Sequence, residues 1–194
     1  MVPVRLPDGR GVTIRSIHGS DKPLLAGLFD RLSAESRHRR FFAGIESLSP
    51  SMLRYFTDLD HHDHEALVAL DDAGLMVGVA RFVRHPHHPT DAEVAVTVVD
   101  DWQGGGLGTA LVALLCDRAR AEDVTRFTGD TLWSNRPMHE LLRELGAPEF
   151  DPRDGVDAFS LLLPAEPLAD RLPELLDHAV ARRRPSPCDP SGGP

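Results

Sequence analysis

Hydrophobic and polar residues alternate along the chain with two different periods, and each period predicts one type of element. The strand period of two is clearest at 93–99, where Val94, Val96 and Val98 alternate with smaller or polar side chains. Shorter apolar segments bounded by turn residues predict five further strands, at 12–17, 65–70, 75–83, 127–133 and 156–163.

Helical spacing begins directly after the strand at 93–99. Leu107, Leu111, Leu114 and Leu115 fall on one face, and charged residues fall on the other. Further helices are predicted where a capping residue and a proline precede an apolar stripe, starting near Pro23, at Pro50 and at Asn135. The predicted order is β-α-α-β-β-β-α-β-α-β, followed by an apolar stripe at 166–184.

The period changes inside a glycine-rich turn at 103–108. A strand that passes through glycines into a helix places backbone N–H groups at the positive end of the helix dipole, which favours a phosphate-bearing cofactor. The dinucleotide pattern Gly-x-Gly-x-x-Gly is excluded because, counted from Gly104, its last position is Thr109. The Walker A pattern is excluded because the only lysine is Lys22.

The turn instead reads Gln-x-x-Gly-x-Gly, as Gln103, Gly106 and Gly108. With its strand and helix, it resembles the acetyl-CoA motif of the GNAT superfamily of N-acetyltransferases. The string Leu-Ser-x-x-Ser-Arg-x-x-Arg-Phe-Phe at 32–42 is similar to the GNAT domains of bacterial protein lysine acetyltransferases. Without that similarity, the string indicates a solvated helix end followed by two core phenylalanines.

This resemblance covers roughly residues 10–164. It implies an α/β (α+β) GNAT fold, with a mixed twisted sheet of six to seven strands flanked by helices on both faces. We expect an acetyltransferase domain at 1–164, a C-terminal amphipathic helix extension at 165–184 and a disordered tail at 185–194. The extension either packs back on the domain or joins a partner subunit, so monomer and homodimer both stay open.

The resemblance also implies acetyl-CoA as the acyl donor. The expected cofactor-binding residues lie on the strand, the turn and the starts of two helices: Val96, Thr97, Val98, Gln103, Gly104, Gly105, Gly106, Leu107, Gly108, Thr109 and Asn135. Asn135 is equally suited to cap the helix that it starts. Relatives often have Arg or Lys where this chain has Gly105, so one phosphate-facing charge is missing.

Glu93 is the candidate catalytic residue. It lies ten residues before Gln103, where protein acetyltransferases of the superfamily have a catalytic glutamate. Acetyl transfer needs a neutral amine, and a carboxylate general base can remove the proton. Burial in a valine-rich strand is expected to raise its pKa towards neutrality. Read without the motif, Glu93 is an exposed carboxylate that balances an arginine.

One expected group is missing. Many family members have a tyrosine seven residues after the asparagine that starts the following helix, where it can protonate the leaving thiolate. Counting from Asn135 gives Leu142. The general acid is therefore open, and water is the alternative.

Composition narrows the possible partners. The net charge of −9 disfavours nucleic acid and favours cationic substrates such as amines. No apolar run reaches the roughly 20 residues that span a bilayer, so no membrane association is expected. The two cysteines, Cys116 and Cys188, indicate no disulfide framework, and a cytoplasmic location is the default prediction.

Six of the ten histidines form two clusters, at 61–64 and 85–88, on either side of the hairpin that turns at 71–74. Hairpin pairing should bring the clusters together as a zinc or nickel site or a pH-sensitive edge. Their spacing matches no ligand motif, so no metal site is predicted.

The favoured function is a cytoplasmic acyltransferase that moves acetyl from acetyl-CoA to a primary amine by direct attack, with protein lysine the first choice of acceptor. Two alternatives stay open: acetylation of a small amine metabolite or antibiotic, and a non-catalytic acetyl-CoA sensor or assembly module.

Overall fold

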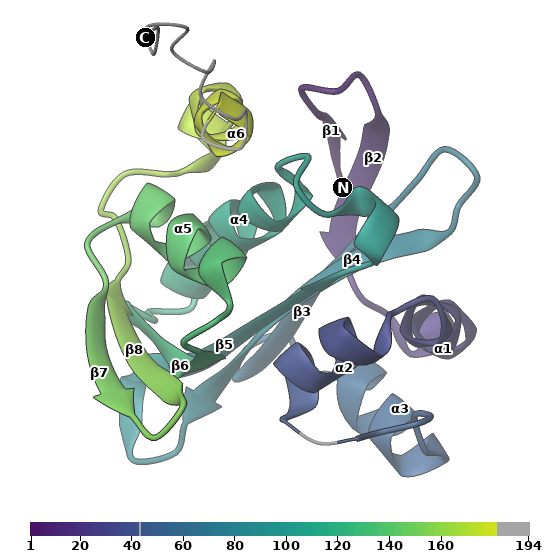
Figure 1. Cartoon of the computed structure of the whole chain (residues 1–194), viewed down its shortest axis with the longest axis horizontal. Helices are drawn as coiled ribbons and strands as arrows, with labels where there is room; N and C mark the ends of the chain where they lie inside the picture. Colours follow the sequence, from purple (N-terminus) through teal and green to yellow (C-terminus); the bar gives the residue numbers. More distant parts are fainter. Residues whose placement is uncertain (43, 182–194) are drawn as a thin grey trace, which may run out of the picture.

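The computed structural model describes residues 1–42 and 44–181. Within them the chain forms one eight-stranded sheet in the order β1-β2-β3-β4-β5-β6-β8-β7 (Figure 1). Its strands are β1 Val2–Arg5, β2 Gly11–Ser16, β3 His64–Leu70, β4 Met76–His85, β5 His88–Val98, β6 Arg126–Leu132, β7 Glu149–Arg153 and β8 Val156–Leu162. The helices are α1 Lys22–Asp30, α2 Ala34–Phe41, α3 Pro50–Thr57, α4 Leu107–Ala121, α5 Arg136–Leu145 and α6 Leu172–Ala181.

Helices cover both faces of the sheet, as predicted. In Figure 1, α1, α2 and α3 lie below the sheet, where α1 contacts β4 and α2 contacts β5. On the upper face α4 packs on β3, β4 and β5, and α5 lies beside α4. No helix in the described part of the chain is long and apolar enough to cross a membrane.

Two predictions about the elements were wrong. The sheet has eight strands rather than six to seven, because the edge strands β1 and β7 were missed. Each contains a proline, Pro3 or Pro152, and proline weakens the sequence signal of a short strand. The predicted order has two helices before the strand at 65–70, but a third is present, because the segment at 32–42 forms a separate helix, α2. Its N-cap is Ser33, whose Oγ accepts a hydrogen bond from the backbone N–H of Ser36.

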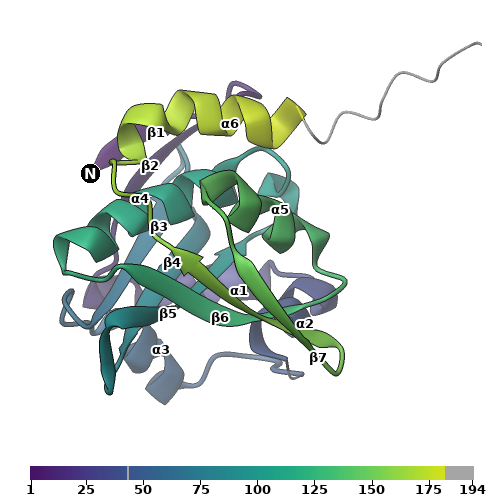
Figure 2. The ribbon, with the colours of Figure 1, turned by 90° about the vertical axis from the view of Figure 1, so that its left-hand side faces the viewer.

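The C-terminal extension packs back on the same chain. Leu168, Leu172, Leu175 and Leu176 are all buried, and α6 contacts α4 and α5 (Figure 2). Asp117 of α4 holds the segment that leads into α6, because its carboxylate accepts hydrogen bonds from the backbone N–H groups of Leu168 and Ala169. The apolar stripe therefore serves this domain rather than a dimer interface. The tail predicted to be disordered, 185–194, lies outside the described residues.

The sheet divides between β5 and β6. β5 pairs with β4 in antiparallel register from Glu93 to Val98, but it pairs with β6 in parallel only as far as Glu93 and Thr128. Beyond that pair the two strands diverge. The edge of β5 at 94–98 is therefore unpaired with β6, and an unpaired edge offers backbone N–H and C=O groups to a ligand.

Candidate active site

The glycine turn connects β5 to α4 with a backbone that only glycine adopts without strain. Gly104 and Gly106 have φ angles of 81° and 89°, and Gly106 is the N-cap of α4. A Cβ at Gly106 would also lie 2.9 Å from a terminal methyl group of Leu176 in α6. The turn thus directs the first N–H groups of α4 towards the gap beside β5, where an anion can bind.

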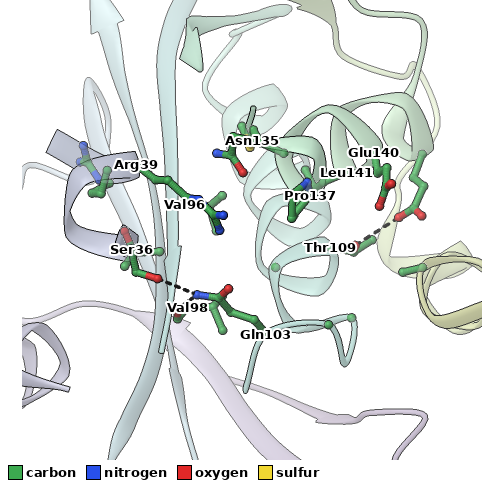
Figure 3. Close-up of a pocket in the computed structure, with 18 residues that line it drawn as sticks. Ser36, Arg39, Val96, Val98, Gln103, Thr109, Asn135, Pro137, Glu140 and Leu141 are labelled. Carbon is green, nitrogen blue, oxygen red and sulfur yellow. Dashed lines mark hydrogen bonds between the residues drawn. The ribbon is translucent and has the colours of Figure 1, made fainter. Parts of the chain in front are cut away.

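A cavity of about 160 Å³ opens between α2, β5, α4 and α5 (Figure 3). Nine of the eleven predicted cofactor-binding residues line it: Val96, Thr97, Val98, Gln103, Gly104, Gly106, Gly108, Thr109 and Asn135. The other two do not. Leu107 is 1% exposed and belongs to the core, and Gly105 faces Arg10 and Asp8, both within 3.1 Å of a Cβ built on it.

Asn135 stands before α5 and its side chain makes no capping hydrogen bond. Figure 3 shows it on the opposite side of the cavity from Ser36 of α2. The geometry therefore favours the cavity-facing interpretation of Asn135 over the capping one. Leu142, which occupies the position of the missing tyrosine, is fully buried.

The cavity also includes residues that the motif did not identify. They come mainly from α2 and α5: Ser36, Arg39, Arg40, Pro137, Met138, Glu140, Leu141 and Glu144. For the α2 residues the signal was present in the sequence, in the similarity of the segment at 32–42. For the α5 residues, only the packing of α5 beside α4 brings them to the site.

A hydrogen-bond network ties α2 to the glycine turn. Gln103 Nε2 donates to Ser36 Oγ at 3.1 Å and to the Val98 carbonyl at 3.0 Å. Ser36 Oγ and Ser33 Oγ both donate to one carboxylate oxygen of Asp100, at 2.9 and 2.7 Å. Burial raises the pKa of Asp100, but the hydrogen bond from the Ser33 backbone N–H and those from the two serine hydroxyls outweigh it and hold the pKa below its usual value. The two serines of the string therefore position Gln103.

Glu93 lies outside this cavity, three residues or about 10 Å back along β5 from Val96. It is the last β5 residue that pairs with β6, so its carboxylate stands where the two strands separate. Contrary to expectation, Glu93 is exposed. The burial on which the expected pKa rise depended is absent.

Glu93 lines a second, open groove of about 660 Å³. Four other carboxylates lie along it, those of Asp91, Asp130, Glu149 and Asp151, together with Arg153. This acidic groove and the 160 Å³ cavity lie on either side of the point where β5 and β6 separate.

The two histidine clusters do come together, because the backbone N–H of Arg84 donates to the Asp63 carbonyl at 2.8 Å. Three of their side chains have other partners, however. His61 contacts Glu65 at 2.8 Å, His62 contacts Glu122 at 2.6 Å, and His85 contacts Thr128 at 2.8 Å. Among the described residues, no three or more His, Cys, Asp or Glu side chains are grouped so that they could hold a metal ion.

The chain is similar in sequence to known acetyltransferases. It is 32% identical over 177 residues to the acetyltransferase Pat of Mycolicibacterium smegmatis, covering 91% of this chain and 53% of that protein, so it spans about half the length of that relative. It is 34% identical over 161 residues to an acetyltransferase of Pseudomonas aeruginosa, covering 81% of this chain and 86% of that protein.

A solved structure has the same fold. The GNAT domain of S. lividans PAT superposes with a TM-score of 0.78 at 28% identity, covering 84% of this chain and 96% of that domain. Residues 30–147 match the profile of the acetyltransferase (GNAT) family. The predicted fold class is confirmed, and the chain belongs to the acetyltransferase (GNAT) family of acyltransferases.

Proposed function

We propose that this chain transfers the acetyl group of acetyl-CoA to a primary amine, with a protein lysine as the acceptor and Glu93 as the general base. The observation that carries the proposal is the place of Glu93. Its carboxylate stands where β5 and β6 separate, between a cavity suited to the cofactor and an acidic groove suited to an amine.

The cavity supports acetyl-CoA as the donor. The N-terminus of α4 and the glycines before it offer N–H groups to the pyrophosphate. The unpaired edge of β5 at 94–98 offers strand-like hydrogen bonds to the amides of the pantetheine arm. A cofactor that follows this edge from the turn directs its thioester towards Glu93.

The acidic groove supports a cationic acceptor. An amine reaches the site as an ammonium ion, and the five carboxylates along the groove attract it. Glu93 takes a proton from the ammonium group, and the neutral nitrogen attacks the thioester carbon. The C–N bond forms, the C–S bond breaks, and CoA leaves as a thiolate. The nitrogen then loses its second proton to leave a neutral amide. Leu142 has no proton to give, so we assign to water the transfer of this second proton from the nitrogen to the thiolate.

The choice of protein lysine rests on the similarity to the relative named Pat and on the segment at 32–42. A non-catalytic acetyl-CoA sensor is the second candidate, favoured by one observation: Leu142 stands where a general acid is expected.

The test compares Glu93→Gln with Glu166→Gln, the same change at an exposed position after β8. We expect Glu93→Gln to lower kcat about 10²- to 10⁴-fold, because it removes the general base, while the Kd for acetyl-CoA stays unchanged. Glu166→Gln should match the wild type in both. The assay follows CoA release with lysine peptides, and calorimetry gives the Kd. Unchanged turnover in Glu93→Gln would refute the proposal, and wild-type binding without turnover on any amine would favour the sensor.

A further inference from the structure

Two arginines near Glu93 have few partners. Arg81 of β4 is only 8% exposed, and within the described residues its guanidinium donates one hydrogen bond, from Nη2 to the Phe56 carbonyl at 3.3 Å. Arg40 of α2 is half-buried and makes no hydrogen bond to any residue that the structure describes. Neither forms an ion pair there, whereas Arg15 forms one with Asp21. We call Arg40 and Arg81 the arginine pair.

The electrostatic surroundings of the arginine pair are unfavourable for its charge. Burial, followed by the like charge of Arg40, lowers the pKa of Arg81 to about 9. Burial also lowers the pKa of Arg40. The charge of Glu93 opposes both shifts without offsetting burial. An arginine is charged at neutral pH, and a buried charge that forms no ion pair is costly. Ring contacts offset part of this cost, since the Arg81 guanidinium lies 4.1 Å from the ring centroid of Phe56.

Arg81 lies on the same face of the sheet as the proposed base, Glu93. In the register of β4 and β5, Arg81 is opposite Ala95 and Val83 is opposite Glu93, so Arg81 and Glu93 are diagonal neighbours. Such neighbours are about 7–8 Å apart, within reach of long side chains. Glu93 lies within electrostatic range of both arginines.

A small cavity of about 30 Å³ adjoins the arginine pair. Arg40 and Thr97 line both this cavity and the larger one beside it. A cavity needs roughly 10–15 Å³ of such volume to hold one water molecule, so this one has room for about two. Most of its lining is apolar, and its polar side chains are those of Arg40, Arg81 and Thr97. Tyr55, the only tyrosine of the chain, is 56% exposed and lies next to Arg81, with 5.8 Å between its ring centroid and the guanidinium.

We propose that the arginine pair is a carboxylate subsite for the acceptor, and that it binds an acidic side chain one or two residues from the lysine that is acetylated. The inference rests on the proposed function. Guanidinium groups pair with carboxylates through charge-assisted, often bidentate hydrogen bonds. The carboxylates of the acidic groove repel an acidic side chain from the opposite side of Glu93. The two surfaces together orient the acceptor.

The experiment uses peptides with one lysine and a single Glu at each of the four positions from two before to two after it. Each peptide has a twin with Gln in place of Glu. The readout is the Glu/Gln ratio of kcat/KM for each position. For the wild type we expect a ratio of about ten or more at one position at least, as hydrogen bonds to a charged group give. In Arg40→Gln and Arg81→Gln the ratio should fall to about one.

Arg54→Gln is the matched control, because it removes an exposed arginine of α3 outside both cavities and should keep the wild-type ratio. Arg81→Lys keeps the positive charge but lacks the planar guanidinium that binds a carboxylate through two hydrogen bonds. It should therefore retain more of the preference than Arg81→Gln does. Arg40 is half-buried, so Arg40→Gln tests the inference even if Arg81→Gln fails to fold, which circular dichroism would report.

Three results would overturn the inference. The first is a wild-type ratio near one at every position while the peptides are still acetylated, a result that leaves the proposed function intact. The second is a preference that persists in Arg40→Gln. The third is a preference for succinyl-CoA over acetyl-CoA that Arg40→Gln abolishes, because the carboxylate would then belong to the donor. Acetylation of free amino acids but of no peptide would instead refute the lysine acceptor itself.

Discussion

Replacement of Gly106 by alanine tests whether the cofactor turn depends on a left-handed backbone. Gly106 has a φ of 89°, and an L-residue in this region loses about 1–2 kcal/mol. The new Cβ would also lie 2.9 Å from a methyl group of Leu176, which must move. We therefore expect Gly106→Ala to lower the free energy of unfolding by about 1–2 kcal/mol or slightly more.

Gly27→Ala is the matched control. Gly27 lies inside α1, and a Cβ there meets nothing within 4 Å. Alanine in place of a helical glycine is worth about 1 kcal/mol, so this variant should be more stable than the wild type. The same chemical change thus has opposite signs at the two positions.

The assay is thermal unfolding together with acetyl-CoA binding. For a chain of this length, 1 kcal/mol corresponds to about 2–4 °C in Tm. Gly106→Ala should melt several degrees below the wild type and bind acetyl-CoA more weakly, because the first N–H groups of α4 move. Gly27→Ala should melt higher with unchanged affinity. A Tm of Gly106→Ala at or above that of the wild type would refute the reasoning.

Two further predictions concern buried groups. Asp21 pairs with Arg15 at 2.7 and 2.9 Å, and breaking this pair by Asp21→Asn should cost about 3–5 kcal/mol in urea unfolding. The Arg15 hydrogen bond holds the pKa of Asp21 below its usual value of 3.8. The stability that this pair contributes is therefore present above about pH 4 and is lost as the pH falls through the folded-state pKa. Between pH 5 and 2, Asp21→Asn should lose less stability than the wild type. Burial raises the pKa of Cys116, so iodoacetamide should label it only after unfolding, as peptide mass spectrometry can show; rapid labelling of the native chain would contradict its burial.

The strand, turn and helix at the centre of the site could be predicted from the sequence because their signals are local. A period of two, a run of glycines and a helical leucine stripe succeed one another within 93–115. The two glycines with positive φ, Gly104 and Gly106, lie inside that run. Nine predicted residues line one cavity for the same reason, since one short segment positions most of them.

Other features depend on contacts that no local pattern reveals. Glu93 was expected to be buried because valines surround it in sequence. Its exposure follows instead from the parallel register with β6, which ends at Thr128. The edge strands β1 and β7 escaped prediction because proline lowers the strand signal at the sheet edges where it is tolerated. The arginine pair is formed by α2 and β4, which are about 40 residues apart in sequence.

Helix α6 lies beyond the domain boundary predicted at residue 164, yet it contacts the candidate site. Leu176 packs against Gly106 in the turn, and Ala179 lines the 160 Å³ cavity. Glycine at position 106 is therefore required for two reasons, the left-handed backbone and the close approach of α6. Only the first can be seen in the motif. Because a residue 70 positions later restricts the turn, the structural unit that forms the candidate site continues past the predicted boundary and through α6.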